Sequence, residues 1–293
     1  MASFYDEIQS NQRRTYFLFA SFLLLLFLIA YAFGFVLGLG NFGFVFAVVI
    51  AVILTLVMYH QSDKIVLSVT KARPVTKEEF PYLYHSIEAL SLGAGIPQPR
   101  LYVMDEDAMN AFATGRDPQH AIVVVTTGLL KRMNRLELEG VLSHELSHIR
   151  NYDIKVMMLA TVFAGSIIIL SDILLRSTIW GGGNRREGRG SVYVVILGIA
   201  LAILAPIFAQ LIKMAVSRKR EFMADASAAQ LTRYPAGLAG ALEKIEKDSV
   251  QMKNASNATS HLFISNPLKR DNISKWFSTH PPIQERIQRL KAM

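Results

Sequence analysis

Two histidines one helical turn apart are the residues of this chain best suited to hold a metal ion. They are His144 and His148, in VLSHELSHIR (141–150). In an α-helix, positions i and i+4 differ by about 40° of rotation, so both imidazoles can reach one tetrahedral metal. Glu145 lies about 100° from His144, too far for a third ligand but close enough to take a proton from water at the metal. This spacing predicts a zinc hydrolase; the alternative is a solvated amphipathic helix.

A second pair of residues, Glu221 and Asp225 in EFMAD (221–225), repeats the one-turn spacing. Because the chain has no cysteine, a metal site must use histidine nitrogen and carboxylate oxygen. Glu221 can be the third ligand. Asp225 can accept a hydrogen bond from the free ring N–H of a liganding histidine and fix its tautomer. The alternative is a surface ion pair between Arg220 and Glu221 on an ordinary helix.

A long uncharged run near the start of the chain predicts membrane helices. No charged residue occurs at positions 15–62, and one bilayer crossing needs only about 20 residues. The turn-rich GLGNFG (38–43) divides the run. We therefore expect a helical hairpin at about 16–37 and 43–60. The alternative is a pair of buried core helices in a large soluble domain.

Two later apolar runs, Val156–Leu175 and Val192–Ile212, predict a second membrane hairpin, for about four transmembrane helices. An even number of crossings places residues 1–15, 61–155 and 214–293 on one side, which we expect to be cytoplasmic. The arginines of the linker between the two runs count against this orientation. The formal net charge of +8 fits basic loops near anionic lipid, and no nucleic-acid-binding motif occurs.

The remaining sequence predicts a mainly helical domain with a small sheet. Leu138, Leu142, Leu146 and Ile149 share the face of the HExxH helix opposite the histidines. In NAFATGRDPQH (110–120), the first half can form a strand and GRDPQ a turn, giving a hairpin with 121–126. The other expected elements are helices at 78–96, 134–153, 220–234, about 236–250 and 278–293, strands at 100–104 and 121–130, and a loosely ordered loop at 253–272.

The motifs, taken in order, resemble those of the HtpX-type membrane zinc metalloproteases, bacterial relatives of the CAAX prenyl endopeptidases. The resemblance rests on NAFATG (110–115), SHELSHIRNYD (143–153), SRKREFMADASAA (217–229) and THPPIQERI (279–287), together with the apolar segments. It covers nearly the whole chain. It implies one Zn²⁺ per chain, held by His144, His148 and Glu221, with Glu145 as the general base and Asp225 supporting a ligand.

The resemblance also implies that residues 110–113 bind the substrate backbone as an added β-strand. These residues are Asn110, Ala111, Phe112 and Ala113. Without the resemblance, a plain edge of the hairpin is the simpler reading.

A donor for the oxyanion of the transition state is expected from the last motif. His280 precedes Pro281 and Pro282, and Arg286 lies six residues later in a helix that could return to the site. The resemblance points to the same two residues, His280 and Arg286. The alternative is that His280 caps the last helix and Arg286 pairs with a surface carboxylate. The remaining histidines, which lack partners at ligand spacing, are interpreted as ordinary surface or interface residues: His60, His85, His120 and His261.

The predicted fold is an α-helical membrane protein with a mainly helical, zincin-like catalytic domain that carries a small β-hairpin or sheet. Residues 1–62 form the first transmembrane hairpin and 156–213 the second. Residues 63–155 carry the HExxH helix, and 214–293 carry the third ligand. If both runs cross the bilayer, the two halves of the zinc site meet at the membrane surface on one side.

The expected function is zinc-dependent endopeptidase activity on misfolded or damaged membrane proteins, at a bacterial inner membrane and with the active site facing the cytoplasm. The expected partners are membrane-protein and polypeptide substrates, the lipid bilayer and other quality-control proteases, with no nucleic acid. One alternative is a prenyl-protein endopeptidase. Another is a non-catalytic membrane scaffold or transporter, for which Asp172 and Gln210 are the polar candidates within the apolar runs.

Overall fold

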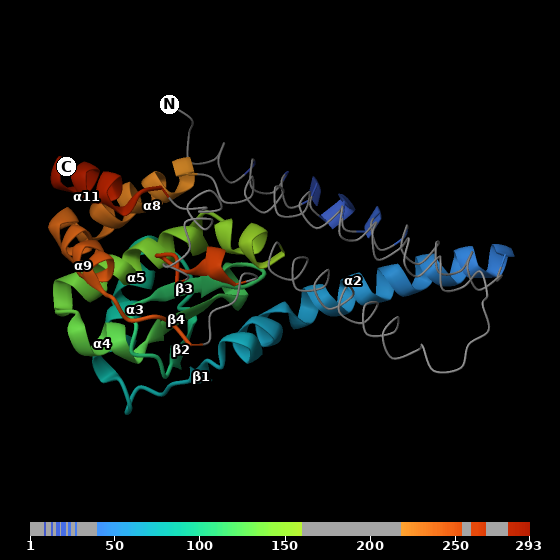
Figure 1. Cartoon of the computed structure of the whole chain (residues 1–293), viewed down its shortest axis with the longest axis horizontal. Helices are drawn as coiled ribbons and strands as arrows, with labels where there is room; N and C mark the ends of the chain where they lie inside the picture. Colours follow the sequence, from blue (N-terminus) through green and yellow to red (C-terminus); the bar gives the residue numbers. More distant parts are fainter. Residues whose placement is uncertain are drawn as a thin grey trace.

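The computed structural model describes residues 40–159, 218–253, 259–267 and 281–293, with single positions between 9 and 27. These parts form a mainly helical structure around one small mixed sheet, as predicted (Figure 1). The elements are α2 (Gly40–Thr70), β1 (Arg73–Pro74), α3 (Pro81–Ala94), β2 (Arg100–Met104), β3 (Ala111–Thr114), η1 (Pro118–His120), β4 (Ile122–Thr126), α4 (Thr127–Arg132), α5 (Arg135–Arg150), α8 (Arg218–Thr232), α9 (Pro235–Lys247), η2 (Ser260–Leu262) and α11 (Ile283–Lys291).

The sheet has the strand order β1-β2-β4-β3, so β3 is an edge strand. β4 pairs with β2 in parallel and with β3 in antiparallel orientation, the latter in the register Ala111↔Val125 to Thr114↔Ile122. All five residues of β4 are buried, which explains why its sequence is continuously apolar rather than alternating. The predicted hairpin between 110–113 and 121–126 is confirmed by this pairing.

The prediction of a strand over 121–130 is wrong in its second half, because a helix, α4, begins at Thr127. The Thr126 hydroxyl accepts a hydrogen bond from the Leu129 N–H and caps this helix at its N-terminus. Gly128 lies so close to the backbone of Asp107 that a Cβ there would be 1.9 Å from its carbonyl oxygen. The apolar residues after Thr126 therefore form a helical turn, in which only glycine fits at position 128.

Helix α5 is the central element of the domain. It begins with a capping box, in which the Asn134 side chain accepts from the Glu137 N–H and the Glu137 carboxylate accepts from the Asn134 N–H. Its apolar face is buried as predicted, at Leu138, Leu142, Leu146 and Ile149. α5 contacts α3, α8, α9 and β3, so the sheet and three helices surround it. Most of α5 is therefore buried, and its buried polar side chains are held in fixed positions.

Helix α2 projects away from the sheet as a single long rod (Figure 1). It continues to Thr70, ten residues beyond the predicted end of the membrane helix at about residue 60. Near its C-terminal end, the Ser62 hydroxyl contacts the Met158 sulfur at 2.7 Å, and Asp63 pairs with Arg100 at 2.8 Å. These contacts join α2 to the domain that carries the sheet.

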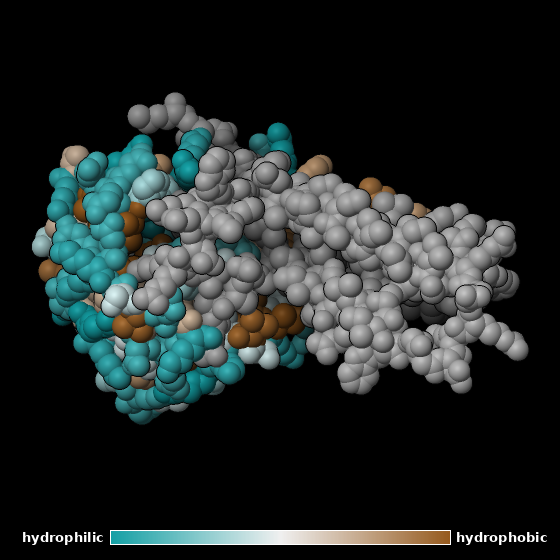
Figure 2. Space-filling view, in the orientation of Figure 1, coloured by the Kyte–Doolittle hydropathy of each residue, from teal (hydrophilic) through white to brown (hydrophobic). Residues whose placement is uncertain are grey.

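Among the residues whose side chains the structure describes, no helix combines the length and the hydropathy of a membrane span. Most of the predicted spans at 16–37, 156–175 and 192–212 lie outside the described residues. On the side shown in Figure 2, the described surface of the sheet-bearing domain is mainly hydrophilic, with small separate hydrophobic patches.

The prediction of a loosely ordered loop at 253–272 is wrong for its described part, residues 259–267. Leu262, Phe263 and Ile264 are at most 3% exposed and belong to the main hydrophobic core. The Phe263 ring packs edge-to-face on Phe112 of β3, with 4.9 Å between the ring centroids. Three consecutive large apolar side chains in an otherwise polar stretch hold this segment against the edge of the sheet.

Candidate metal centre

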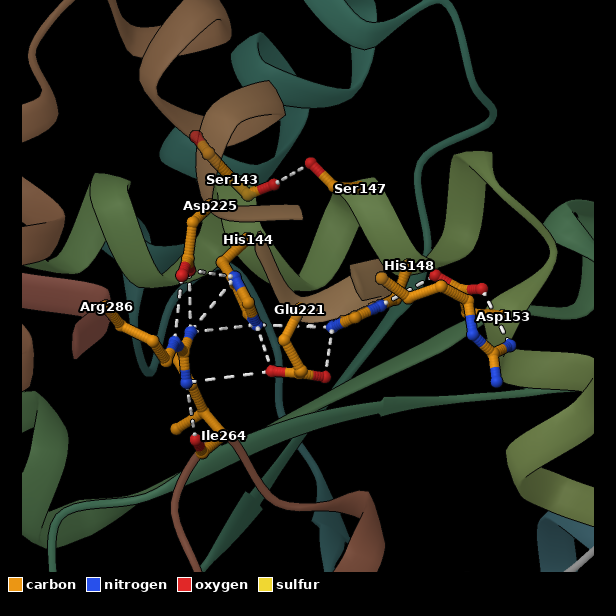
Figure 3. A network of polar contacts seen from close by, with 10 residues as sticks. Ser143, His144, Ser147, His148, Asp153, Glu221, Asp225, Ile264 and Arg286 are labelled. Carbon is orange, nitrogen blue, oxygen red and sulfur yellow. Dashed lines mark hydrogen bonds and ion pairs between the residues drawn. The ribbon is translucent and has the colours of Figure 1, made fainter. Parts of the chain in front are cut away.

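Three buried side chains from two helices converge on one point (Figure 3). They are His144 and His148 of α5 and Glu221 of α8, and each offers a ligand atom within 4.8 Å of the other two. The two Nε2 atoms lie 3.2 Å apart, and the Glu221 oxygens lie 3.5 Å from the His148 Nε2 and 3.6 Å from the His144 Nε2. All three residues are at most 5% exposed, so the alternatives of a solvated helix and of a surface Arg220–Glu221 pair are wrong.

Carboxylates on the far side of each imidazole set its orientation. Asp225 lies 3.0 Å from the His144 Nδ1, and Asp153 lies 2.9 Å from the His148 Nδ1. With each Nδ1 engaged by a carboxylate, each Nε2 is turned towards Glu221 and towards the other histidine. This is the arrangement by which proteins fix the tautomer and raise the basicity of a metal-binding histidine. Asp225 therefore lies where it was predicted.

Arginines hold both of these carboxylates. Arg286 of α11 donates two hydrogen bonds to Asp225, from Nε at 2.9 Å and from Nη2 at 2.7 Å. Its Nη2 also lies 3.4 Å from the His144 ring nitrogens. Arg220 of α8 contacts Asp153 at 3.1 Å. Because Arg286 is 1% exposed and Asp225 is 2% exposed, the alternative that Arg286 pairs with a surface carboxylate is wrong.

Asp153 and Arg220 were not predicted as site residues. Asp153 ends the SHELSHIRNYD motif but lies beyond the end of α5, where helical periodicity gives no guide to its neighbours. Tyr152 has a positive φ of 59°, and this turn brings Asp153 back to His148. The signals available in the sequence were the acidic residue shortly after the second histidine and the basic residue directly before Glu221.

Glu145 is 2% exposed, interacts electrostatically with both histidines and accepts a hydrogen bond from the Ala113 backbone of β3. Its burial raises the pKa of the carboxyl group, and the neighbouring Glu221 adds to this. The histidines and a hydrogen bond with the Ala113 backbone act in the opposite direction, and the net pKa is raised. A carboxylate whose pKa is raised from its ordinary acidic value is better matched to proton transfer near neutral pH. Its position beside an edge strand and the two histidines fits the predicted general base.

Neighbouring charges and hydrogen bonds shift the pKa values of His144 and Asp225. Burial and the Arg286 charge lower the pKa of His144, but hydrogen bonds to Asp225 and Glu221 outweigh them and raise it to about 9 without metal. Burial raises the pKa of Asp225, but the charge and hydrogen bonds of Arg286 outweigh it and bring it to about 2. Asp225 is therefore ionised at neutral pH. A divalent metal bound to His144 must displace a proton, which couples metal binding to pH.

The other predicted residues are placed as follows. Asn110 and residues 111–113 are buried at the edge of the sheet, with the Ala113 backbone against Glu145. His280 lies outside the described residues. Of the remaining histidines, His60, His85 and His120 are exposed, whereas His261 is 3% exposed and contacts the Met157 carbonyl oxygen at 3.2 Å.

Residues 77–293 match the model of peptidase family M48, over a region that includes the whole cluster. The chain belongs to this family. It is a metalloprotease, as predicted, and the alternative of a non-catalytic scaffold or transporter is not supported.

Relatives with similar sequences are named as HtpX proteases, which confirms the predicted resemblance. A protease HtpX homolog from Dictyoglomus turgidum is 48% identical over 99% of this chain and 95% of its own length. Homologs from Thermoanaerobacter pseudethanolicus and Streptococcus gordonii are 46% and 42% identical over 99% of this chain and 97% and 99% of their own lengths.

A solved structure shares the fold. The crystal structure of S. mikatae Ste24p is similar with a TM-score of 0.51 and 21% sequence identity. The similarity covers 92% of this chain and 62% of the Ste24p chain. At this level of identity, the comparison supports the architecture of the protein alone.

Proposed function

We propose that this protein is a zinc-dependent endopeptidase that hydrolyses misfolded or damaged membrane proteins. The observation that carries the proposal is the convergence of His144, His148 and Glu221, together with the buried Glu145, which interacts with both histidines and with the Ala113 backbone of β3. Two histidines and one carboxylate form a typical protein donor set of catalytic zinc sites in hydrolases, in which water or substrate takes the fourth position.

The donor geometry fits zinc. The Nε2 atoms of His144 and His148 lie 3.2 Å apart, and both Nδ1 atoms are engaged by carboxylates. Two nitrogens each bound at about 2.0–2.1 Å to one tetrahedral ion are separated by about 3.3 Å. We therefore propose one Zn²⁺ per chain. When bound, zinc supplies a Lewis acid that polarises a carbonyl oxygen and makes water more acidic.

The other residues around the metal centre have separate roles in the proposed reaction. Glu145 accepts the proton of the attacking water and returns it to the leaving amine. Asp225 and Asp153 hold the two imidazoles, and Arg286 holds Asp225. β3 offers the outer edge of the sheet to an extended peptide, which binds by main-chain hydrogen bonds. His280 remains a candidate hydrogen-bond donor to the oxyanion of the transition state. The donor groups of Arg286 are largely engaged by Asp225, so Arg286 would contribute by holding Asp225 in place.

The membrane location is part of the proposal. The uncharged run at 15–62 and the two runs between His148 and Glu221 support a multi-pass protein of the bacterial inner membrane. With an even number of crossings, the two halves of the site lie on the cytoplasmic side. Such a site meets the exposed cytoplasmic parts of membrane proteins. The lipid bilayer and other quality-control proteases remain the proposed partners.

Proteolysis in detergent tests this function. Zinc-loaded protein is expected to cut a heat-unfolded membrane protein at least about tenfold faster than its folded form, because an added β-strand must be extended. A chelator should abolish both reactions, and zinc should restore them. Equal cleavage of the two forms would contradict the quality-control role. Preferential cleavage of a farnesylated peptide over the same peptide without the lipid would favour a prenyl-protein endopeptidase.

A further inference from the structure

The proposed ligand Glu221 lies on α8 between two contacts that join this helix to the region of α5. On one side of Glu221, the Arg220 Nη1 donates a hydrogen bond to the Asp153 Oδ1 at 3.1 Å, just beyond the end of α5. On the other side, Asp225 lies 3.0 Å from the His144 Nδ1. Arg220 and Asp225 are about 7.5 Å apart along the helix axis. Two contacts at this separation restrict the rotation of α8 against α5 more than one contact does.

Arg220 is also linked to the second histidine. Asp153 uses its Oδ1 for Arg220 and its Oδ2 for the His148 Nδ1, which lies 2.9 Å away (Figure 3). Arg220, Asp153 and His148 are 5%, 2% and 5% exposed, so little water can replace these contacts. One arginine is thus connected to two of the three proposed ligands. It reaches His148 through Asp153, and it is joined to Glu221 by the backbone of α8.

The contact between Arg220 and Asp153 joins the two halves of the metal centre. These two residues are 67 positions apart in the sequence, and residues 156–212, with the two apolar runs, lie between them. His148 precedes this segment and Glu221 follows it, so the two halves must be held together across a long stretch of chain. Neither Arg220 nor Asp153 is a proposed ligand. Their contact therefore does not depend on the ion.

We propose that Arg220 is a positioning residue of the metal centre, which holds Glu221 near His148 independently of the ion. The proposal rests on the proposed zinc centre and adds to it a residue that touches neither zinc nor substrate. Without Arg220, α8 can move away from the turn that carries Asp153, and only a fraction of the molecules has all three ligands in place. The apparent affinity for zinc then falls in proportion to that fraction.

Zinc affinity of the purified full chain in detergent tests this role, measured by competition with a chelator of known affinity. Arg220→Met is expected to bind zinc about 10–100-fold more weakly than the wild-type protein, the usual effect of losing a residue that supports a ligand. Arg218→Met is the matched control, because Arg218 is an exposed residue of the same helical turn, and it should bind zinc as tightly as the wild-type protein. Equal affinities of folded Arg220→Met and Arg218→Met would overturn the proposal.

Two further variants separate positioning from a general loss of stability. Leu242→Ala removes a fully buried side chain from α9 and should lower stability while zinc affinity is kept. A loss of affinity in Leu242→Ala equal to that in Arg220→Met would show that any destabilisation weakens the site, and would overturn the proposal. Arg220→Lys keeps the positive charge and should bind zinc more tightly than Arg220→Met. Equally weak binding by these two variants would show that the ion pair is not the cause.

A double variant assigns the effect to the contact with Asp153. Asp153→Asn alone should weaken zinc binding about 10–100-fold, because His148 loses its carboxylate. If Arg220 acts through Asp153, adding Arg220→Met should cause no further loss, whereas independent effects would multiply to about 10²–10⁴-fold and overturn the proposal.

The double variant also decides if Arg220→Met does not fold. Arg220→Met leaves the buried Asp153 carboxylate without its partner, whereas the double variant removes both charges. Its zinc affinity should then equal that of Asp153→Asn, and a further tenfold loss would overturn the proposal. Wild-type protein that binds zinc but cuts no protein substrate would overturn the endopeptidase function alone. Wild-type protein that binds no zinc would overturn both.

Discussion

Replacing Glu145 with glutamine is expected to lower kcat for peptide hydrolysis by at least about 10²–10⁴-fold, the usual contribution of a general base. Glutamine keeps the size of the side chain and can still accept a hydrogen bond from the Ala113 backbone, but it cannot take a proton. Because the predicted ligands are untouched, the variant should bind as much zinc as the wild-type protein. Activity is measured on an unfolded protein substrate with metal-replete enzyme.

Glu139→Gln is the matched control for this variant. Glu139 lies on the same helix, α5, but pairs with Arg135 at 2.9 Å and with the Tyr82 hydroxyl, on the side away from the metal centre. The control should keep nearly full activity, since partly exposed ion pairs of this kind contribute little to stability. Near-normal hydrolysis by metal-replete Glu145→Gln would remove Glu145 from the mechanism.

Replacing Arg286 with methionine is expected to destabilise the protein by about 3–5 kcal/mol, the usual cost of breaking a buried ion pair. Arg286 is 1% exposed, and its loss leaves the Asp225 carboxylate buried without the two hydrogen bonds that Arg286 donates. The pKa of Asp225 should then rise from about 2, because burial is no longer outweighed. The free energy of unfolding is measured by denaturant titration on protein in detergent.

Arg289→Met is the control on the same helix. Arg289 has a side chain that is 54% exposed, pairs with Glu285 and stacks on the Phe222 ring at 3.8 Å, so its loss should cost only about 1 kcal/mol. Arg286→Met should also weaken metal binding, since Asp225 orients His144, and Arg286→Lys should fall between the two. Equal stability of the Arg286 and Arg289 variants would show that the buried pair does not organise the site.

Each half of the metal cluster was predictable from helical geometry. A spacing of four residues brings His144 and His148 together, and the same spacing links Glu221 to Asp225. The contact between these two pairs depends on the tertiary structure, and it was expected from the resemblance and from the order of the motifs. The hairpin of β3 and β4 followed from two possible strands on either side of the turn GRDPQ, and its pairing is confirmed.

What could not be predicted depends on contacts between distant parts of the chain. Asp153 reaches His148 through a turn at positive φ, which has no periodic signature. Residues 262–265 were expected in a loose loop, because polar neighbours on both sides obscure three buried apolar side chains. The prediction of a strand over 121–130 was wrong beyond Thr126. There the helix depends on the Thr126 side-chain cap and on the close approach of the Asp107 backbone to Gly128.

Elemental analysis of the purified protein tests the central claim, that His144, His148 and Glu221 form a metal centre. We predict about one zinc ion per chain in the wild-type protein. Zinc should be almost absent from folded His144→Ala and fully retained in His120→Ala, which changes an exposed histidine paired with Asp117. Folded wild-type protein that binds no zinc, or His144→Ala that keeps a full zinc ion, would contradict the account.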